Sequence, residues 1–487
     1  MAERRRRRWI ALAVLCVGTL QGTAAAGRDE DPLSTARRLP LPVSERLASL
    51  ELPCADALPR PLTPLDAVRQ ALCRHPQTGQ AWAAVEAQAA AVGLGQSAYW
   101  PGLSATASFS RVRVESEYPD RPELDSSFDG RSGGQSLGLE WVLFDFGLRA
   151  ANLRRERALF VAACASQNET ILAVFLDAAR AYFAAEQAQA SLATEVQAEE
   201  AARRSAEVAQ AKVAAGVGLE ADQLQAQTAH AQASLNRIRA QERLDSALGT
   251  VASAMGLRPG TPILLPEAGS AMADGPEAAA QIDGLMERAQ QLHPRIAAAR
   301  AQLQAAQDAV AAARAGGRPS LALSAFTERS DTPVDRVSSR QQIESSSLGL
   351  RLSAPLFEGF GRTYRIRQAE ALREGREAEL LAARQDVAQA VWESYVAVRG
   401  GAEARRASRR LLDSARQSYE LASGRYQAGV GNILELLRAQ SDLATAQQQE
   451  VLARTRWRLA RLELAASLGQ IDFWMLRERD PARAGDD

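Results

Sequence analysis

The chain contains the same pattern twice, and this duplication constrains its fold more than any other feature. The segment AGVGLEADQLQAQ at residues 215–227 returns as AGVGNILELLRAQ at residues 428–440, an offset of 213 residues (428 minus 215). The segment SLGLEWVLFDFG at 136–147 returns as SLGLRLSAPLFEGFG at 347–361. Solenoid units are only about 20–50 residues long. The pattern therefore predicts a duplicated domain whose two halves pack together.

The first 26 residues are predicted to be an export signal. Five arginines at residues 4–8 precede a short apolar core at 9–20 and three alanines at 24–26, where cleavage is expected. Leu15 precedes Cys16 where a lipoprotein site needs a small residue, so we expect no lipid anchor. No later segment approaches about 18 consecutive apolar residues, so we expect no transmembrane helix and predict export from a bacterial cytoplasm.

Composition favours a mostly helical protein without nucleic-acid binding or catalysis. The chain has 58 basic and 58 acidic residues, a formal net charge of +0, and Lys212 is its one lysine. Balanced charge gives no indication of nucleic-acid binding. The three histidines are scattered, and no catalytic triad, phosphate-binding loop or HExxH motif is present. We therefore expect no enzyme, cofactor or metal site.

Three cysteines, Cys54, Cys73 and Cys164, remain after the predicted signal. Cys54 and Cys73 flank a Pro-rich turn and the start of a helix. In an oxidising compartment they either form a disulfide or remain as two small buried thiols. Cys164 falls within a long helical segment, where we expect a packing role.

Periodicity places long helices around two pairs of short strands. A helix is predicted from the N-cap Thr63 to about Ser97, and after the first strand pair nothing breaks the chain from Leu148 to Ala214. That segment is 67 residues, or about 100 Å of helix, and the second copy repeats it at 362–428. The strands alternate between two kinds of residue, with a long exposed polar loop in the first pair.

This pattern divides the chain into a signal, two repeats and their connections. We predict a signal at 1–26, an irregular segment at 27–61, a first repeat at 62–256 with strands at about 102–115 and 135–146 and a tip at 215–219, a linker at 257–275, a second repeat at 276–469 with strands at about 319–329 and 346–357 and a tip at 428–432, and a tail at 470–487.

Four strands per chain cannot close a barrel, and an open sheet cannot face lipid because its edges would be unsatisfied. An exported chain with four alternating strands is therefore predicted to share a barrel with copies of itself. Three copies give twelve strands, and cyclic symmetry makes that closure natural. The long helices would continue the wall as a cylinder. A coiled-coil rod or periplasmic adaptor is the alternative, but it leaves the paired strands unexplained.

The repeat, the strand-to-helix junctions at 144–147 and 356–361 and the two Gly-Val-Gly turns resemble the TolC family of outer-membrane exit ducts over about residues 62–469. The resemblance implies a homotrimer with a 12-stranded β-barrel in outer-membrane lipid of a Gram-negative bacterium and a duplicated α-helical barrel in the periplasm. Its non-lipidated signal resembles the type I secretion branch, including the cyclolysin (adenylate cyclase toxin) secretion component. Implied partners are a periplasmic adaptor, an inner-membrane ABC transporter and a secreted protein. Efflux of small molecules is the alternative.

The two turns are predicted to form the periplasmic tips, because glycine permits the positive φ that a tight helical turn needs. Repeat symmetry places Asp222 and Glu435 at equivalent positions beyond the turns, where a trimer forms rings of carboxylates. The resemblance implies constriction positions at Tyr426, Glu435 and Arg438. Glu435 and Arg438 either form an i, i+3 ion pair or are solvated charges. The resemblance also implies adaptor docking at the turn residues, which are Gly216, Val217, Gly218, Gly429, Val430 and Gly431.

Overall fold

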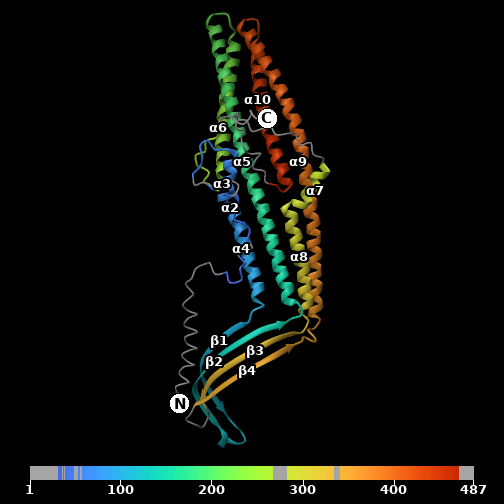
Figure 1. Ribbon diagram of the computed structural model, residues 1–487. Coiled ribbons are helices and arrows are strands. Elements are labelled where there is room, and N and C mark those ends of the chain that lie inside the picture. Colours follow the sequence, from blue (N-terminus) through green and yellow to red (C-terminus); the bar gives the residue numbers. More distant parts are fainter. Residues whose placement is uncertain are drawn as a thin grey trace. The chain divides into compact units, whose positions relative to one another are not determined.

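The computed structural model describes residues 31–35, 37, 39–48, 53–54, 57–266, 282–333 and 340–470. These residues form two compact units (Figure 1). The strand unit contains residues 86–153 and 317–356 with the segment up to 39, and the helical unit contains residues 40–85, 154–316 and 357 onward. The predicted signal at 1–26, the linker from 267 to 275 and the tail from 471 lie outside the described residues.

The strand unit is built on one antiparallel sheet with the order β1-β2-β3-β4. The strands are β1 (Gly102–Ser116), β2 (Ser126–Phe144), β3 (Ser320–Pro333) and β4 (Arg340–Ser353). Strand β2 pairs with β3, so the two predicted strand pairs join in one sheet. The register shifts between Val142 and Phe144, which interrupts this central ladder.

The first hairpin is longer than the sequence predicts. Strand β2 begins at Ser126 rather than near residue 135, because residues 126–134 pair without interruption with 108–116 of β1. Backbone N–H and C=O groups make this ladder, and Gly, Ser and Asp supply them as well as strand-favouring residues do. The predicted long loop is therefore wrong, and a short connection with one 3-10 turn, η2 (Pro122–Leu124), replaces it. The second pair, expected at about 319–329 and 346–357, also forms a longer hairpin with a shorter connection.

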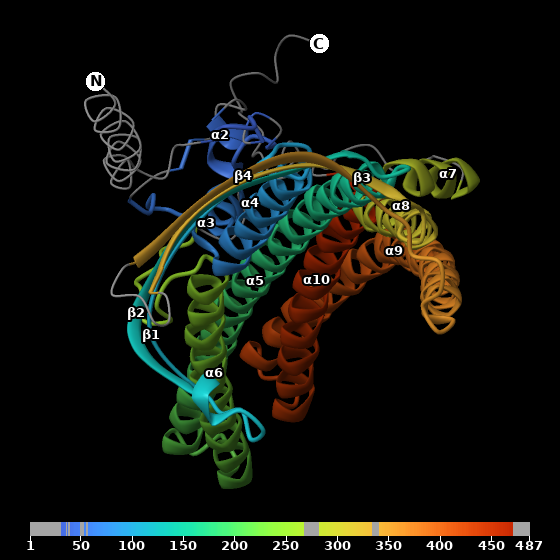
Figure 2. The same ribbon diagram turned by 90° about the horizontal axis from the view of Figure 1, so that it is seen from below.

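Four long helices dominate the helical unit. They are α5 (Leu148–Ala214) and α9 (Gly361–Gln427), each 67 residues, with the returning helices α6 (Glu220–Ala254) and α10 (Ile433–Ser467), each 35 residues. Helices α5 and α10 lie side by side, flanked by α6 and α9 (Figure 2). Cross-helix ion pairs fix this contact, including Arg180 with Glu463 at 2.8 Å and Arg458 with Glu186 at 3.0 Å.

The remaining helices are broken at equivalent His-Pro steps, where the sequence predicted continuous helix. The segments are α3 (Pro64–Arg74), α4 (Pro76–Ser97), α7 (Ile282–Leu292) and α8 (Pro294–Ala315). A residue before proline avoids the helical region, and His75 and His293 have ψ of 131° and 126°. Each histidine accepts a hydrogen bond through Nδ1 from the backbone N–H two residues on, at 3.3 and 3.2 Å. The prediction of one helix from 63 to 97 was therefore wrong.

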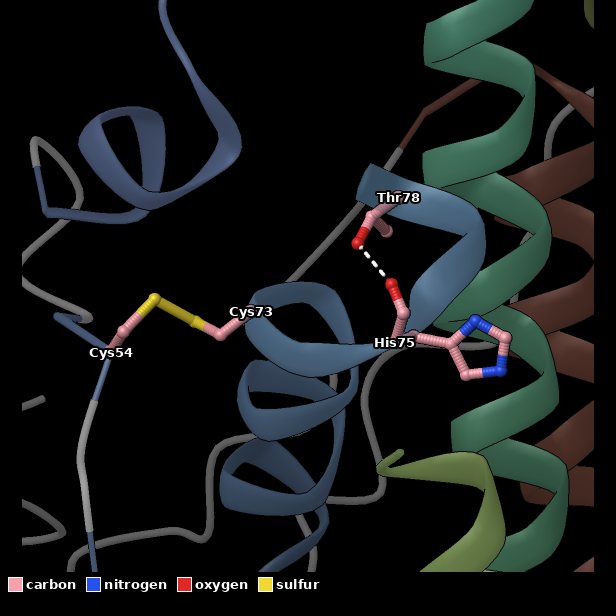
Figure 3. Close-up of a disulfide and its surroundings, with 4 residues drawn as sticks. All are labelled: Cys54, Cys73, His75 and Thr78. Atoms are coloured by element: carbon pink, nitrogen blue, oxygen red, sulfur yellow. Dashed lines mark hydrogen bonds between the residues drawn. A yellow bond between two sulfur atoms is a disulfide. The ribbon is translucent and has the colours of Figure 1, made fainter. Parts of the chain in front are cut away.

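The segment before α3 is attached to the helical unit covalently and by packing. Cys54 and Cys73 form a disulfide with a Cα–Cα distance of 6.0 Å (Figure 3), which answers the question that the sequence left open. Part of the segment predicted to be irregular forms a short helix, α2 (Val43–Ala48). The Tyr182 hydroxyl donates to the Leu62 carbonyl at 3.1 Å. The core beneath contains Val68, Leu72, Phe175, Tyr182, Phe183, Val251, Met255 and Leu462.

Helix α5 is more apolar than the sequence reading allowed. It contains an 18-residue window with mean hydropathy 1.5, enough by length and composition to cross a membrane. The same helix contributes Ile171, Phe175 and Phe183 to the core of the helical unit. Packing against the segment before α3 and against α6 accounts for this apolar character.

Candidate functional site

One face of the sheet carries a band of large apolar side chains. Directly opposed residues of neighbouring strands project from the same face, and the register pairs Leu103 with Leu139 and Leu323 with Leu350. Leu348 is 76% exposed and Phe109 is 82% exposed. The band contains Leu103, Phe109, Leu137, Leu139, Trp141, Leu321, Leu323, Leu348, Leu350 and Leu352. A continuous exposed apolar surface of this kind marks contact with lipid or with another protein.

The opposite face is lined by small polar residues. The register places Ser104 opposite Gly138, Ser136 opposite Glu328, and Ser345 on the far side of Glu328. One face of the sheet thus suits a hydrocarbon environment and the other suits water. Among the described strands, β1 and β4 each have one hydrogen-bonded neighbour, so both outer edges are open. Open edges cannot face lipid, because each unpaired backbone group there costs several kcal/mol.

Arg149 fixes the junction between sheet and helix, and the sequence analysis missed it. It forms an ion pair with Asp145 at 2.9 Å and donates to the carbonyls of Val142 at 2.6 Å and Ala98 at 3.2 Å. It thereby ties the end of β2 to the end of α4. Arg362 is its counterpart 213 residues on and donates to a main-chain carbonyl in the last turn of α8 at 3.2 Å. This repetition is the sequence signal that would have identified it.

The two Gly-Val-Gly turns have the same geometry. Gly216 and Gly429 have φ of +75° and +78°, which side chains disfavour. A Cβ added at Gly218 or Gly431 would lie 2.8 Å from a backbone nitrogen of the preceding helical turn. Both glycines of each turn are therefore required, the first by its dihedral angle and the second by lack of space.

The central residue of each turn is the most exposed part of the tip. Val217 is 79% exposed and Val430 is 72% exposed, and Leu219, just beyond the first turn, is 68% exposed. Each tip therefore presents an apolar side chain to a partner or to solvent.

Tyr426 links the two tips. It is 5% exposed and packs in a small cluster with Ala209 and Ala226 of the first hairpin and with Ile433 and Leu436 of the second. Burial raises the pKa of Tyr426, and the charge of Asp222 on α6 raises it further. Two of the predicted constriction residues, Tyr426 and Asp222, are therefore brought together.

The other two predicted residues do not pair with each other. Glu435 lies 3.8 Å from Arg425, across the turn of its own hairpin. Arg438 is exposed, and it forms no ion pair in the part of the chain that the structure describes. The suggested Glu435–Arg438 pair is therefore wrong, because Arg425 at the end of α9 reaches the carboxylate instead.

Lys212 supplies a second link between the tips. Its ammonium lies 3.9 Å from the centroid of the Tyr426 ring and donates to the Tyr426 carbonyl at 2.8 Å. The repeat offset makes Arg425 the counterpart of Lys212 and Val213 the counterpart of Tyr426. The interaction therefore has no equivalent in the opposite direction. The sequence signal was the presence of a single lysine, whose role the pattern alone does not reveal.

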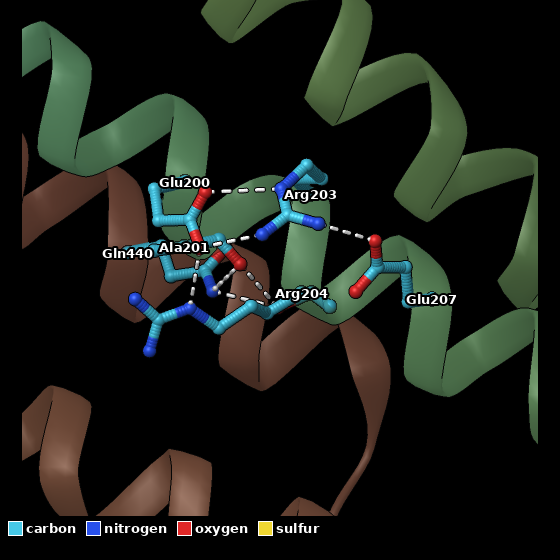
Figure 4. Close-up of polar contacts among 7 residues, drawn as sticks. Glu200, Ala201, Arg203, Arg204, Glu207 and Gln440 are labelled. Atoms are coloured by element: carbon cyan, nitrogen blue, oxygen red, sulfur yellow. Dashed lines mark hydrogen bonds and ion pairs between the residues drawn. The ribbon is translucent and has the colours of Figure 1, made fainter.

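Farther along the helices, polar side chains join α5 to α10. Gln440 of α10 donates to the Ser205 hydroxyl at 2.8 Å and to the Ala201 carbonyl at 3.4 Å (Figure 4). Beside this contact Arg203 and Arg204 bind Glu200 at 2.7 and 3.0 Å, and their hydrogen bonds lower its pKa to about 2.

Glu195, on the same helix, is only 6% exposed and accepts a hydrogen bond from Gln448 of α10. Burial raises the pKa of Glu195. In the part of the chain that the structure describes, no group of three or more His, Cys, Asp and Glu could hold a metal ion.

Comparison with known proteins identifies the family. The model described as "Outer membrane efflux protein" matches residues 67–257 and 285–470. Protein CyaE of Bordetella pertussis is 35% identical over 477 residues, or 96% of each chain. Outer membrane protein TolC of Escherichia coli is 24% identical over 200 residues, which is 39% of this chain and 41% of TolC.

Solved structures show the same fold. The outer membrane protein VceC of Vibrio cholerae superposes with a TM-score of 0.69 at 20% identity, covering 83% of this chain and 95% of VceC. The CmeC outer membrane channel of Campylobacter jejuni superposes with a TM-score of 0.71 at 17% identity, covering 83% and 85%. The family match spans most of the chain, and the CyaE match spans nearly all of both chains. The chain therefore belongs to the TolC family of outer membrane efflux proteins.

Proposed function

We propose that three copies of this chain form an outer-membrane channel for an exported protein. The cargo would leave an inner-membrane ABC transporter of a type I secretion system, pass a periplasmic adaptor and exit through the channel. The carrying observation is one sheet of four strands with an apolar face, a small polar face and two open edges.

The number of copies follows from the strands. Outer-membrane barrels have about eight strands or more, and one chain supplies four. In a cyclic assembly the open edge of β4 pairs with β1 of the next copy, which leaves no edge facing lipid. Three copies give twelve strands, three times four, enough for an open bore. This closure supports the homotrimer expected from the family resemblance.

The tips are proposed as the periplasmic gate and the adaptor docking site. A trimer makes one ring each of Asp222 and Glu435, with Tyr426 buried behind the first ring and Arg438 exposed beside the second. Three like charges around a narrow opening attract cations. The exposed Val217 and Val430 offer apolar contacts to an adaptor.

Protein secretion is favoured over efflux of small molecules by the relatives. Similarity to CyaE extends over 96% of both chains, whereas similarity to TolC of Escherichia coli covers 41% of that protein. The absence of a lipid-anchor cysteine beside the predicted signal points the same way. Small-molecule efflux remains the second candidate because the matching family model carries that description. The periplasmic adaptor alternative does not fit a member of an outer-membrane family.

Membrane fractionation and cross-linking test the architecture. We expect the protein in the outer-membrane fraction as a cross-linked trimer, and a monomer in the soluble fraction would contradict the proposal. Leu350→Arg should block insertion, because an arginine facing lipid costs about 2–4 kcal/mol. The matched variant Ser347→Arg, on the opposite face, should insert normally.

A deletion strain tests the cargo. Loss of a large secreted protein with unchanged sensitivity to dyes and detergents supports secretion. Normal secretion with new sensitivity to these compounds would make small-molecule efflux the function instead.

A further inference from the structure

We infer that the watery face of the sheet is shaped to pass a bulky flexible polymer, an unfolded polypeptide, and that its small side chains set the width of the passage. This inference rests on the proposed function, because it takes the apolar face of the sheet as the lipid face. It goes further by naming the residues that select the class of substrate.

Small residues occupy most positions of this face on all four strands. The register brings them into rows, with Ser108 opposite Gly134 and Ser324 opposite Gly349. The set contains Ser104, Thr106, Ser108, Ser110, Ser132, Gly134, Ser136, Gly138, Ser320, Ala322, Ser324, Ser330, Ser345, Ser347, Gly349 and Ser353.

The larger exceptions do not fill the passage. Phe326 lies opposite Gly138, and its ring is 4.0 Å from where a Cβ on that glycine would stand, so the aromatic ring covers the glycine. The charged exceptions are Glu140, Glu328 and Arg351, two acids and one base per chain. The remaining apolar exceptions are Val112, Val142 and Ile343.

The width decides between two classes of substrate. Twelve strands about 4.8 Å apart and tilted about 40° enclose a circle of roughly 12 Å radius at the backbone. Serine and glycine linings leave a clear bore of roughly 15 Å, whereas large side chains on all walls would leave roughly 10 Å. An α-helix with side chains is about 10–12 Å across. A small molecule passes either bore, so only a polypeptide requires the small lining.

The chemistry of the lining suits the same substrate. Hydroxyl groups stay hydrated and exchange hydrogen bonds with water, so they offer a moving chain no lasting partner. A polypeptide presents apolar, acidic and basic side chains in turn. A wall with an apolar patch or a dense charge cluster would retain some of them, and this wall has neither among its central rows.

Cysteine labelling of the assembled channel tests the inference. The background is Cys164→Ser, which removes the one thiol outside the Cys54–Cys73 disulfide after the predicted signal. Ser136→Cys then places a thiol on the watery face and Leu348→Cys places one on the apolar face. Each variant is exposed in membranes to water-soluble maleimides carrying polyethylene glycol of increasing size.

We expect the Ser136→Cys thiol to react with small and large reagents alike, and the Leu348→Cys thiol to react with neither. Adding Ser347→Trp should remove the reaction with the largest reagents, while Ala107→Trp, on the apolar face, should not. Reaction at Ser136→Cys with small reagents alone would overturn the polypeptide inference and leave the channel intact. Reaction at Leu348→Cys but not at Ser136→Cys would overturn the proposed channel itself.

Discussion

Replacing Lys212 with methionine is expected to loosen the contact between the two helical tips. Methionine keeps most of the side-chain length but removes the charge that lies 3.9 Å from the Tyr426 ring centroid and donates to its carbonyl at 2.8 Å. A partly exposed cation–π contact contributes about 0.5–1 kcal/mol, and a hydrogen bond from a charged donor about 1.5 kcal/mol. The loss of about 2 kcal/mol corresponds to roughly a 30-fold shift toward separated tips.

Hydrogen exchange of the tip amides measures this shift directly, and the open frequency of single channels in planar bilayers measures its consequence. Because Lys212 is the one lysine of the chain, its rate of acylation by an amine reagent in the unchanged protein reports the same opening. Arg425→Met is the matched control, since Arg425 is the repeat counterpart of Lys212 and makes only a 3.8 Å exposed ion pair, worth about 0–1 kcal/mol. Equal exchange rates in the two variants would refute the reasoning.

Three further changes test the tip, the disulfide and the His-Pro step. Gly431→Ala should lower the melting temperature, because its Cβ would lie 2.8 Å from backbone and overpacking costs about 1–3 kcal/mol. Gly424→Ala, with nothing within 4 Å, should leave the melting temperature unchanged or raise it. Cys73→Ser should cost about 3 kcal/mol of unfolding free energy and abolish the effect of reductant on thermal melts; unchanged melting would contradict the role of the bond to Cys54. Burial lowers the pKa of His293 below 6.5, so its contribution is complete above that pH and is lost as the pH falls through the lowered value. His293→Asn keeps a cap acceptor and should flatten this acid loss in denaturation series; an unaltered pH profile would exclude His293 as its source.

Much of the helical architecture was predictable because it depends on local rules. The 67 residues of α5 contain no Gly or Pro, and glycines with positive φ end the segment, so local propensity and the repeat agree. The His-Pro breaks were visible as motifs, yet their effect on the helix was underestimated. The strand residues 126–134 were missed for another reason: their pairing depends on β1 through the backbone, and side-chain pattern does not report it.

The candidate site divides in the same way. Repeat symmetry placed Asp222 and Glu435 beyond equivalent turns, and the glycines identified those turns. Three-dimensional packing decided which partners meet, since Lys212 reaches Tyr426 across 214 residues and Glu435 meets Arg425 rather than Arg438. Long flexible side chains choose among several nearby partners, and only the positions of neighbouring helices determine which one is close enough.

By itself, the sequence determined that the chain is a duplicated domain of long helices and four short strands with glycine turns, because periodicity and dihedral preference are local properties. Tertiary structure decided that the strands form one sheet with an apolar face and a small polar face, and that Cys54 and Cys73 are bonded. It also decided that one lysine joins the two halves at their tips. These features depend on register and on contacts between distant segments, and a one-residue change of register would exchange the two faces of a strand.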